Sequence, residues 1–477
     1  MKLRVDEIID CISNKRNGEG QYAGTYPAQE VSCAVIDSRL VEAGGVFLAT
    51  PGERVDGHKF IGQVFEKGAM LVVTEKSPQQ VEAEHGIPAS VWGAYVLVED
   101  SFTALRDIAT YYREQLSIPV VGITGSVGKT STKEFIAGIL AEEKCVLKTE
   151  GNYNNAIGVP LTLLRIRPEH EVAVVEMGIS DFGEMTVLTQ MAKPDIAVIT
   201  NIGQCHLENL GDRDGILRAK TEIFKGMKEG AHVCLYAGDD KLASIREACG
   251  GAPHFFGLEP DDEVYATDLE SHGLLGTGFV AHFAQGAEEI AVQVPLPGIH
   301  MVINALAGAS VAKVLGYSVQ SIARGISHMQ PVGGRNQIHN LPKFMILEDC
   351  YNANPVSMKS SLDLLCMADG AKIAILGDMF ELGAEEKLLH RQVGEYAATK
   401  ELSCLITIGD LASEIYEGCL AAGTIPEVLH FSTKELFVKA FCENVEKIIP
   451  RNACVLLKAS HGMHFETLVE LLKEKAQ

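Results

Sequence analysis

The chain has 477 residues, of which 47% are hydrophobic and 22% are charged. This length allows about three domains with separate cores, and the composition excludes a disordered or fibrous protein. The 41 basic and 63 acidic residues give a net charge of −22, which disfavours nucleic acid and anionic membranes as partners. An anionic ligand would therefore need cations placed locally by the fold.

The amino-terminal segment and the cysteines indicate the compartment. The first residues, MKLRVDEIIDCISN, alternate charged and apolar positions, unlike a signal peptide, and no run approaches the ~18 apolar residues of a membrane span. The twelve cysteines include no CxxC pair, and the two nearest are Cys442 and Cys454. This spacing supports neither a disulfide framework nor a cysteine zinc site. We expect a cytoplasmic protein.

The strand and helix patterns predict an α/β protein. Residues 1–100 have mixed patterning and many turns, and the helical segment SFTALRDIATYYREQL follows them. Short β-branched runs, from IPVVGIT to ACVLLK, then alternate with amphipathic segments, which predicts parallel βαβ sheets. The helix NALAGASVAKVLGY is followed by a second amphipathic segment and then by a glycine turn, PVGGRNQ. We therefore predict domains at 1–100, 101–316 and 317–477.

A glycine-rich loop joins the run IPVVGIT to the helical segment KEFIAGILAEE. Such a loop presents backbone N–H groups and the helix dipole to phosphate oxygens. Lys129 would reach the β- and γ-phosphates, and the hydroxyl of Thr130 or Ser131 would contact Mg²⁺. Ile123 stands where the longer P-loop has a glycine, so the match is to the shorter GxxGKT[ST] form, and an incidental lysine in a strand-to-helix turn is the alternative. The predicted nucleotide-binding residues of the loop are Thr124, Gly125, Ser126, Val127, Gly128, Lys129, Thr130 and Ser131.

Three further residues could complete a metal site. Glu176 ends the run EVAVVE, where an NTPase places its metal-binding carboxylate, although a solvated strand end is the alternative. His206 follows the run DIAVIT, and a surface or cap histidine is the alternative. Lys220 lies in the helical segment LRAKTEIF. Because an ammonium cannot ligate Mg²⁺, Lys220 could join a metal site only after conversion to an oxygen ligand.

These motifs resemble the Mur ligase family, ATP-dependent enzymes that form amide bonds in peptidoglycan precursor synthesis. The shared segments of the central region are GSVGKTST, GNYNNAIGVPLTLL, VVEMG, TNIGQCHLE, AKTEI and GIHMVINALAGASVA. Outside that region, DSR at 37–39, PGERVDGHKFI at 51–61, YNANP at 351–355 and LGDMFELG at 376–383 resemble the branch that adds D-alanyl-D-alanine. The resemblance covers nearly the whole chain in the same order.

The resemblance implies a fold and an activity. The first domain would bind the UDP-sugar, a P-loop ATPase-like second domain would bind ATP and Mg²⁺, and a Rossmann-like third domain would bind the dipeptide. The terminal carboxylate of UDP-MurNAc-tripeptide would attack the γ-phosphate of ATP, and the amine of D-alanyl-D-alanine would then displace phosphate from the acyl phosphate. We expect a monomer. The alternatives are another amide ligase of this type, such as a UDP-MurNAc-tripeptide synthetase or a folylpolyglutamate synthase, and a catalytically silent nucleotide-binding paralogue.

The resemblance also implies roles for single residues. Lys129, Glu176, His206 and Lys220 would be catalytic. Thr130 or Ser131 with Glu176 would hold one Mg²⁺, and His206 with a carbamylated Lys220 would serve the second metal. The remaining implied contacts are Asn304 with adenine; Arg335 and Asp349 with ribose or the terminal phosphate; Ser38 and Arg39 with uridine diphosphate; Asn152, Asn154 and Asn155 with the nucleotide-sugar; and Asn352 and Asn354 with the dipeptide.

Two segments of the carboxy-terminal third allow another interpretation or depart from the family pattern. For YNANP, an Asn-Pro turn after a strand fits the residues equally well. Family members usually have Lys-Gly-Ser-Arg after the last strand, whereas this chain has Lys458-Ala459-Ser460-His461. If the arginine normally contacts the dipeptide or phosphate, its replacement changes affinity or the choice of nucleophile.

Overall fold

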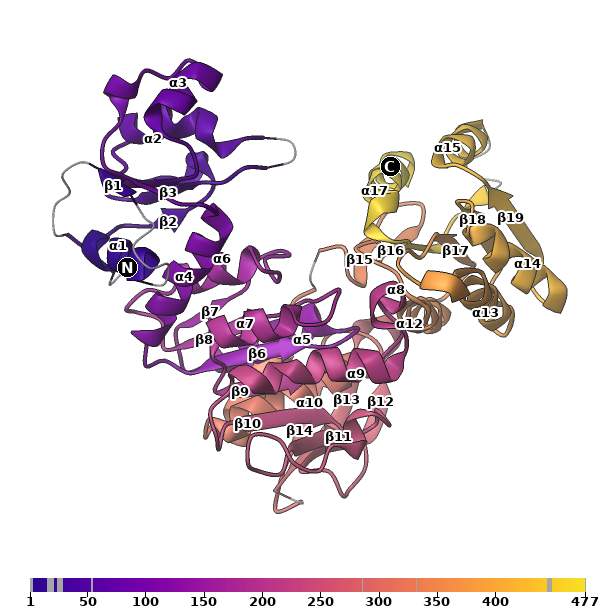
Figure 1. Cartoon of the computed structure of the whole chain (residues 1–477). Coiled ribbons are helices and arrows are strands. Elements are labelled where there is room, and N and C mark those ends of the chain that lie inside the picture. Colours follow the sequence, from indigo (N-terminus) through magenta and orange to yellow (C-terminus); the bar gives the residue numbers. More distant parts are fainter. Residues whose placement is uncertain are drawn as a thin grey trace.

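The computed structural model describes residues 3–14, 21–23, 29–52, 55–284, 286–331, 333–443 and 448–476. Residues 53 and 54, within the PGERVDGHKFI segment, lie outside them. The described residues form three lobes, each around one sheet, with the first and third lobes at opposite ends of the central lobe (Figure 1). The expected three-domain α/β fold is confirmed. None of the described helices is long and apolar enough to cross a bilayer.

The amino-terminal lobe contains a sheet of order β1-β5-β4-β3-β2. β1 is antiparallel to β5, and the other neighbours are parallel. Its strands are β1 (Gln21–Ala23), β2 (Ala34–Val35), β3 (Val46–Ala49), β4 (Leu71–Thr74) and β5 (Tyr95–Leu97). Its helices are α1 (Val5–Asn14), η1 (Ser38–Leu40), η2 (Gly57–Phe60), α2 (Ile61–Glu66), α3 (Pro78–His85), η3 (Ala89–Val91) and α4 (Ser101–Glu114).

The central lobe contains a mixed sheet of order β14-β13-β12-β11-β10-β9-β6-β8-β7. Its strands are β6 (Val120–Thr124), β7 (Val146–Lys148), β8 (Val172–Glu176), β9 (Ile196–Ile199), β10 (His232–Tyr236), β11 (His254–Gly257), β12 (Val264–Ser271), β13 (Thr277–Phe283) and β14 (Glu288–Val294). Its helices are α5 (Lys129–Leu140), α6 (Gly158–Leu164), α7 (Glu184–Ala192), α8 (Leu207–Leu210), α9 (Arg213–Thr221), η4 (Glu222–Gly226), η5 (Leu242–Ser244), η6 (Gly273–Leu275), α10 (Ile299–Val314) and α11 (Val319–Ser327).

We expected a parallel central sheet, but the sheet is mixed. β6, β8 and β9 are entirely buried and pair in parallel, because helices cover both faces. β12, β13 and β14 instead pair as antiparallel neighbours. Burial alternates residue by residue along β13, the pattern of a strand with one covered face. The βαβ pattern of the sequence therefore predicted only the parallel part.

The carboxy-terminal lobe contains a sheet of order β15-β16-β20-β17-β18-β19, parallel except for β15 against β16. Its strands are β15 (Gln337–Asn340), β16 (Met345–Glu348), β17 (Lys372–Gly377), β18 (Cys404–Ile408), β19 (Glu427–Phe431) and β20 (Cys454–Lys458). Its helices are α12 (Pro355–Cys366), η7 (Gly383–Glu385), α13 (Glu386–Ala398), α14 (Ala412–Ala422), α15 (Lys434–Glu443), η8 (His461–Met463) and α17 (Glu466–Ala476).

The amino-terminal and central lobes share an apolar core, whereas the carboxy-terminal lobe has cores of its own. One cluster includes Ile8 and Val96 of the amino-terminal lobe together with Val175 and Ile199 of the central lobe. The carboxy-terminal sheet has a separate cluster on each face. Helix α11 buries its apolar side chains in the central core, although it follows residue 316. The boundaries at 100 and 316 stay predictions.

Candidate nucleotide and metal site

The glycine loop lies between β6 and α5, as the sequence predicted. Gly125 has a φ of +147°, and a Cβ there would lie 1.9 Å from Thr200 Oγ1, so only glycine fits. Asn201 Oδ1 accepts hydrogen bonds from the backbone N–H groups of Ser126 (3.1 Å) and Val127 (2.9 Å). Thr200 and Asn201, which follow β9, were missed by the sequence analysis. Their position directly after a parallel strand beside the loop is a signal that could have identified them.

Lys129 begins α5, directly after Gly128, whose φ is +84°. Its Nζ donates a hydrogen bond to Gly125 O at 2.8 Å, so the side chain folds back over the loop. Burial lowers the pKa of Lys129, and the carboxylate of Glu176 partly opposes this shift. The loop therefore holds a cation where phosphate oxygens would meet the helix amino terminus.

Glu176, at the end of β8, is buried and faces the loop. Its Oε1 accepts hydrogen bonds from Thr130 Oγ1 (3.2 Å) and Asn154 Nδ2 (2.9 Å). Its Oε2 makes no hydrogen bond within the described part of the chain, and Lys133 Nζ is 3.8 Å away. Buried Lys133, four residues after Lys129, was also missed by the sequence analysis. A carboxylate oxygen without a hydrogen bond, next to a hydroxyl, suits Mg²⁺, which prefers oxygen ligands.

Lys220 lies on α9 and is 1% exposed. Burial lowers its pKa to about 8; the nearby Cys205 opposes this shift, and the ammonium of Lys129 contributes to it. No hydrogen bond or ion pair of its Nζ occurs among the described residues. The bare amine offers no oxygen to a second metal, so this position suits Mg²⁺ only if Lys220 is carbamylated.

His206 immediately precedes α8, and its φ is +51°. Its Nδ1 is 2.7 Å from Oε2 of Glu381, which belongs to the carboxy-terminal lobe. Cys205, its neighbour in the chain, is close enough to affect the pKa of both Lys129 and Lys220. The sequence analysis did not predict the contact with Glu381, because it joins residues 175 positions apart.

The residues expected around adenine and ribose occupy two neighbouring places. Asn304, on α10, accepts a hydrogen bond from Thr132 Oγ1 at 3.1 Å and lies beside Gly128. The guanidinium of Arg335 stacks on the ring of Tyr351 at 4.1 Å. A shallow pocket next to the loop is lined by residues that include Ser131, Met301 and Arg335. Asn304 and Arg335 thus both lie close to the loop.

Asp349 is buried and already bonded within the carboxy-terminal lobe. Its Oδ2 accepts hydrogen bonds from Lys458 Nζ and Ser361 Oγ, both at 2.5 Å. Lys458 Nζ also donates to Asn352 O at 3.2 Å. Lys458 therefore holds the loop after β16, and a contact of Asp349 with the nucleotide stays a prediction.

Several asparagines expected to bind substrate cap helices. Asn354 Oδ1 accepts from Ser357 N at 2.9 Å, and Ser357 Oγ accepts from Asn354 N at 3.1 Å, which is a capping box for α12. Asn155 Oδ1 accepts from Gly158 N at 2.9 Å at the start of α6. Asn152 and Asn352 are exposed. YNANP leads directly into α12, with Asn354 as the N-cap and Pro355 as the first helical residue, so the segment is a helix start and not an Asn-Pro turn. Binding of the dipeptide stays a prediction.

The two segments expected to hold the nucleotide-sugar come from different lobes. Ser38 is buried, and Arg39 is exposed with its Nη2 2.6 Å from Asp37 Oδ2. The Asp37 carboxylate raises the pKa of Arg39, and Tyr153 of the central lobe adds to this effect. Tyr153 lies between Asn152 and Asn154, so the segments face each other.

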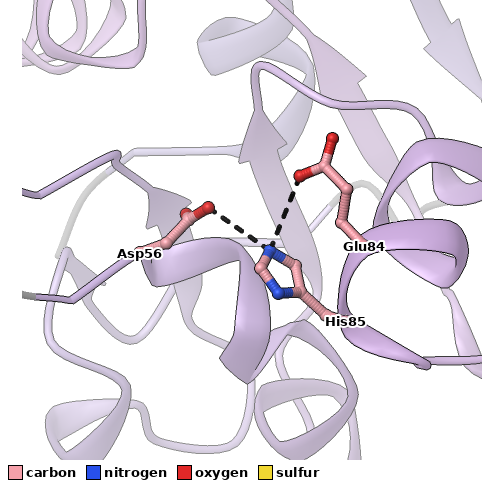
Figure 2. Close-up of side chains that lie close together, drawn as sticks. All are labelled: Asp56, Glu84 and His85. Carbon is pink, nitrogen blue, oxygen red and sulfur yellow. Dashed lines mark hydrogen bonds and ion pairs between the residues drawn. The ribbon is translucent and has the colours of Figure 1, made fainter.

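The amino-terminal lobe also contains a group of possible metal ligands, Asp56, Glu84 and His85 (Figure 2). Lys76 Nζ is 2.8 Å from Asp56 Oδ2 and 2.6 Å from Glu84 Oε2. Because an ammonium already neutralises both carboxylates, we assign no metal to this group.

The segment Lys458-Ala459-Ser460-His461 has buried residues at its start and an exposed residue at its end. Lys458 and Ser460 are buried, and Ser460 Oγ accepts a hydrogen bond from Phe380 N at 2.8 Å. His461 is exposed, with its ring 5.7 Å from that of Tyr351. The replaced arginine position therefore lies next to Tyr351 and the stacked Arg335.

Comparisons with known proteins identify the family. Three family models match in order: the Mur ligase family catalytic domain at residues 30–113, the Mur ligase middle domain at 123–312, and the Mur ligase glutamate ligase domain at 334–461. The UDP-N-acetylmuramoyl-tripeptide--D-alanyl-D-alanine ligase of Bacillus subtilis (strain 168) is 35% identical over 452 residues, which cover 94% of this chain and 94% of that relative.

Solved structures give the same result over almost the full length. A crystal structure of MurF from Acinetobacter baumannii has a TM-score of 0.85, with 32% identity and 98% of each chain covered. The MurF ligase from Thermotoga maritima in complex with ADP has a TM-score of 0.78, with 28% identity, 93% of this chain covered and 97% of that one. The chain belongs to the Mur ligase family.

Proposed function

We propose that this protein joins D-alanyl-D-alanine to UDP-N-acetylmuramoyl-tripeptide and converts ATP to ADP and phosphate. The observation that carries the proposal is the convergence of Lys129, Thr130 and Glu176 at the glycine loop. It occurs in a chain that matches a UDP-N-acetylmuramoyl-tripeptide--D-alanyl-D-alanine ligase over 94% of its length. The ADP complex of the T. maritima relative supports ATP as the nucleotide.

The first step brings together two anions, the tripeptide carboxylate and the γ-phosphate. Lys129 and the N–H groups of the loop would bind the phosphates, and Thr130 Oγ1 with Glu176 would hold Mg²⁺. The metal supplies positive charge against the charge that develops on the transferred phosphoryl group. Asn154 fixes the Glu176 carboxylate through the 2.9 Å bond to Oε1, leaving Oε2 for the metal.

Lys220 has the chemistry that carbamylation needs. Only the neutral amine attacks carbon dioxide, and a pKa of about 8 leaves roughly a tenth of the amine neutral at pH 7. The resulting carbamate would provide oxygen ligands near Cys205, which precedes His206 in the chain. A carbamylated Lys220 and a metal bound through it are part of this proposal.

Phosphate release from ATP tests the proposal. We expect release only when UDP-MurNAc-tripeptide and D-alanyl-D-alanine are both present, and separate reactions with lysine and diaminopimelate tripeptides identify the third residue. Release that depends on neither substrate would leave a different ATPase or a silent paralogue as the better interpretation. Release with UDP-MurNAc-dipeptide and a free amino acid would instead favour a tripeptide synthetase, and release with a folate and glutamate would favour a folylpolyglutamate synthase.

In the same assay, the Lys129→Ala variant tests whether the glycine loop binds the phosphates of ATP. We expect a loss of at least about a hundredfold in ATP turnover, because an electrostatic contact to the transferred phosphoryl group is removed. Lys144→Ala, a lysine change beyond the end of α5, is the matched control and should keep wild-type turnover. Wild-type turnover by Lys129→Ala would refute the phosphate-loop assignment.

A further inference from the structure

Two loops from different lobes meet beside the proposed metal site. His206 to Glu208 belong to the central lobe, and Glu381 to Gly383 belong to the carboxy-terminal lobe. The His206 ring and the Glu381 carboxylate are joined at 2.7 Å, from Nδ1 to Oε2. This bond lowers the pKa of Glu381. The contact is thus a charge-assisted hydrogen bond between lobes.

Backbone and packing support the same contact. A Cβ added to Gly383 would lie 3.2 Å from Glu208 N and 3.3 Å from Glu208 Cα, so the two backbones approach closely. The Leu207 side chain packs against the apolar cluster of the carboxy-terminal lobe. His206 and Glu381 have φ values of +51° and +64°, an uncommon conformation for residues other than glycine.

The two residues before Glu381 are fixed to their own lobe by backbone hydrogen bonds. The backbone N–H of Met379 donates to His390 Nε2 at 2.9 Å, and the N–H of Phe380 donates to Ser460 Oγ at 2.8 Å. His390 and Ser460 are both buried. Glu381 therefore moves with the carboxy-terminal lobe as a unit.

The bond also sets the state of the His206 ring. An ionised carboxylate can only accept, so Nδ1 of His206 must donate. In the neutral ring, Nε2 then carries the lone pair and is available to a metal. Metal-binding histidines are commonly oriented in this way by a carboxylate on the opposite ring nitrogen.

We propose that Glu381 is a positioning residue that orients His206 only when the carboxy-terminal lobe has closed on the central lobe. Closure of the carboxy-terminal lobe and orientation of His206 at the second metal position would then occur together. This inference rests on the proposed function for the role of His206 at the metal. The contact between the lobes stands independently of that role.

Glu381→Ala tests the proposal by two measurements. We expect faster amide hydrogen exchange over residues 206–210 in the presence of Mg²⁺ and ADP, and an increase of about tenfold or more in the Mg²⁺ concentration that gives half-maximal ATP turnover. Glu381→Gln keeps a carbonyl acceptor and should stay within about threefold of wild type. Glu385→Gln, an exposed acid of the same lobe, should match wild type.

Combining the change with His206→Ala shows whether the two residues act as a pair. If they do, Glu381→Ala adds little to the exchange rate once His206 has been replaced. Equal effects of Glu381→Ala in both backgrounds, or unchanged exchange and Mg²⁺ dependence in the single variant, would overturn the proposal.

Gly383→Ala is a second, independent variant, because it obstructs the contact but keeps the carboxylate. Its matched control is Gly423→Ala, at the same φ of +65° but with only Leu420 O, 4.0 Å away, near the new Cβ. We expect faster exchange at 206–210 and a larger radius of gyration in small-angle scattering for Gly383→Ala alone. Equal behaviour of the two variants would contradict the close approach.

The exchange measurement separates this inference from the proposed function. If the wild type showed no dependence on D-alanyl-D-alanine, the proposed function would fail, whereas faster exchange in Glu381→Ala would still establish the contact between lobes. If both substrates were required and exchange were unchanged, only the role of Glu381 would fail.

Discussion

Lys220 illustrates how burial changes the chemistry of a single residue. Its pKa of about 8 lies below the ordinary value of 10.5, because burial removes the solvation of the ammonium. Between these two pH values the unfolded chain binds more protons than the folded protein, so stability rises with pH. The cost of the buried charge is complete below pH 8 and disappears above pH 10.5.

Replacing Lys220 by methionine should remove this dependence. In buffer free of carbon dioxide and with a chelator, Lys220→Met should be more stable than wild type at pH 7, by up to about 3 kcal/mol. The difference should shrink between pH 8 and 10.5. Urea unfolding at several pH values measures it, and a difference independent of pH would show that Lys220 is solvated in the folded protein.

Truncating Lys220 tests its proposed carbamate separately. Lys220→Ala should lower ATP turnover strongly, because the oxygen ligands are lost. Short carboxylates such as acetate or formate should restore part of the activity, since the truncated side chain leaves room for a carboxylate. The control is Lys129→Ala, which the same salts should not rescue. Full activity of Lys220→Ala without added carboxylate would remove the carbamate from the proposal.

At the scale of elements, each strand end and helix start near the site has a local cause. The loop before α5 needs glycine at 125 because Thr200 lies against it, and α12 starts at the capping box of Asn354. The glycine pattern was visible in the sequence. Thr200 and Lys133 were not singled out, because their importance depends on which strand and helix lie beside the loop.

Asn354 allows a cap to be distinguished from a substrate ligand. Asn354→Ala should lower the free energy of unfolding by about 1 kcal/mol, because the Ser357 N–H loses its acceptor. Asn354→Asp keeps a cap acceptor and should retain wild-type stability. If Asn354 only caps α12, the KM for D-alanyl-D-alanine stays unchanged in the Asp variant. A raised KM with wild-type stability would instead show that Asn354 contacts the dipeptide.

At the scale of the whole molecule, the cores predict how the lobes unfold. The amino-terminal and central lobes share an apolar cluster, whereas the carboxy-terminal sheet has its own clusters. Lobes that share a core should unfold together, and a lobe with a separate core can unfold alone.

Scanning calorimetry should therefore resolve two transitions. One belongs to residues of the first two lobes and the other to the carboxy-terminal lobe. Mg²⁺ and ADP at about a hundred times their Kd should stabilise the transition of the first two lobes by about 2.7 kcal/mol. A single transition with equal calorimetric and van't Hoff enthalpies would show that the contacts between lobes couple all three.

The net charge of −22 is not distributed evenly, because basic side chains gather at the candidate site. Lys129 and Lys133 lie close to the buried carboxylate of Glu176, within a protein that is acidic overall. Both lysines belong to α5, and Arg335 stacks nearby on Tyr351. The proposed anionic substrates would thus meet positive charge at the site, although the protein as a whole is acidic.

The sequence by itself determined the α/β class and the glycine loop, because these depend on local periodicity and on residue types at short spacing. The roles of Glu176, His206 and Lys220 follow from the resemblance to the Mur ligases and stay predictions. Only the tertiary structure decided that Asp349 bonds to Lys458 and that Glu381 reaches His206. The physical reason is that these contacts join side chains according to how strands and lobes pack, which no local pattern specifies.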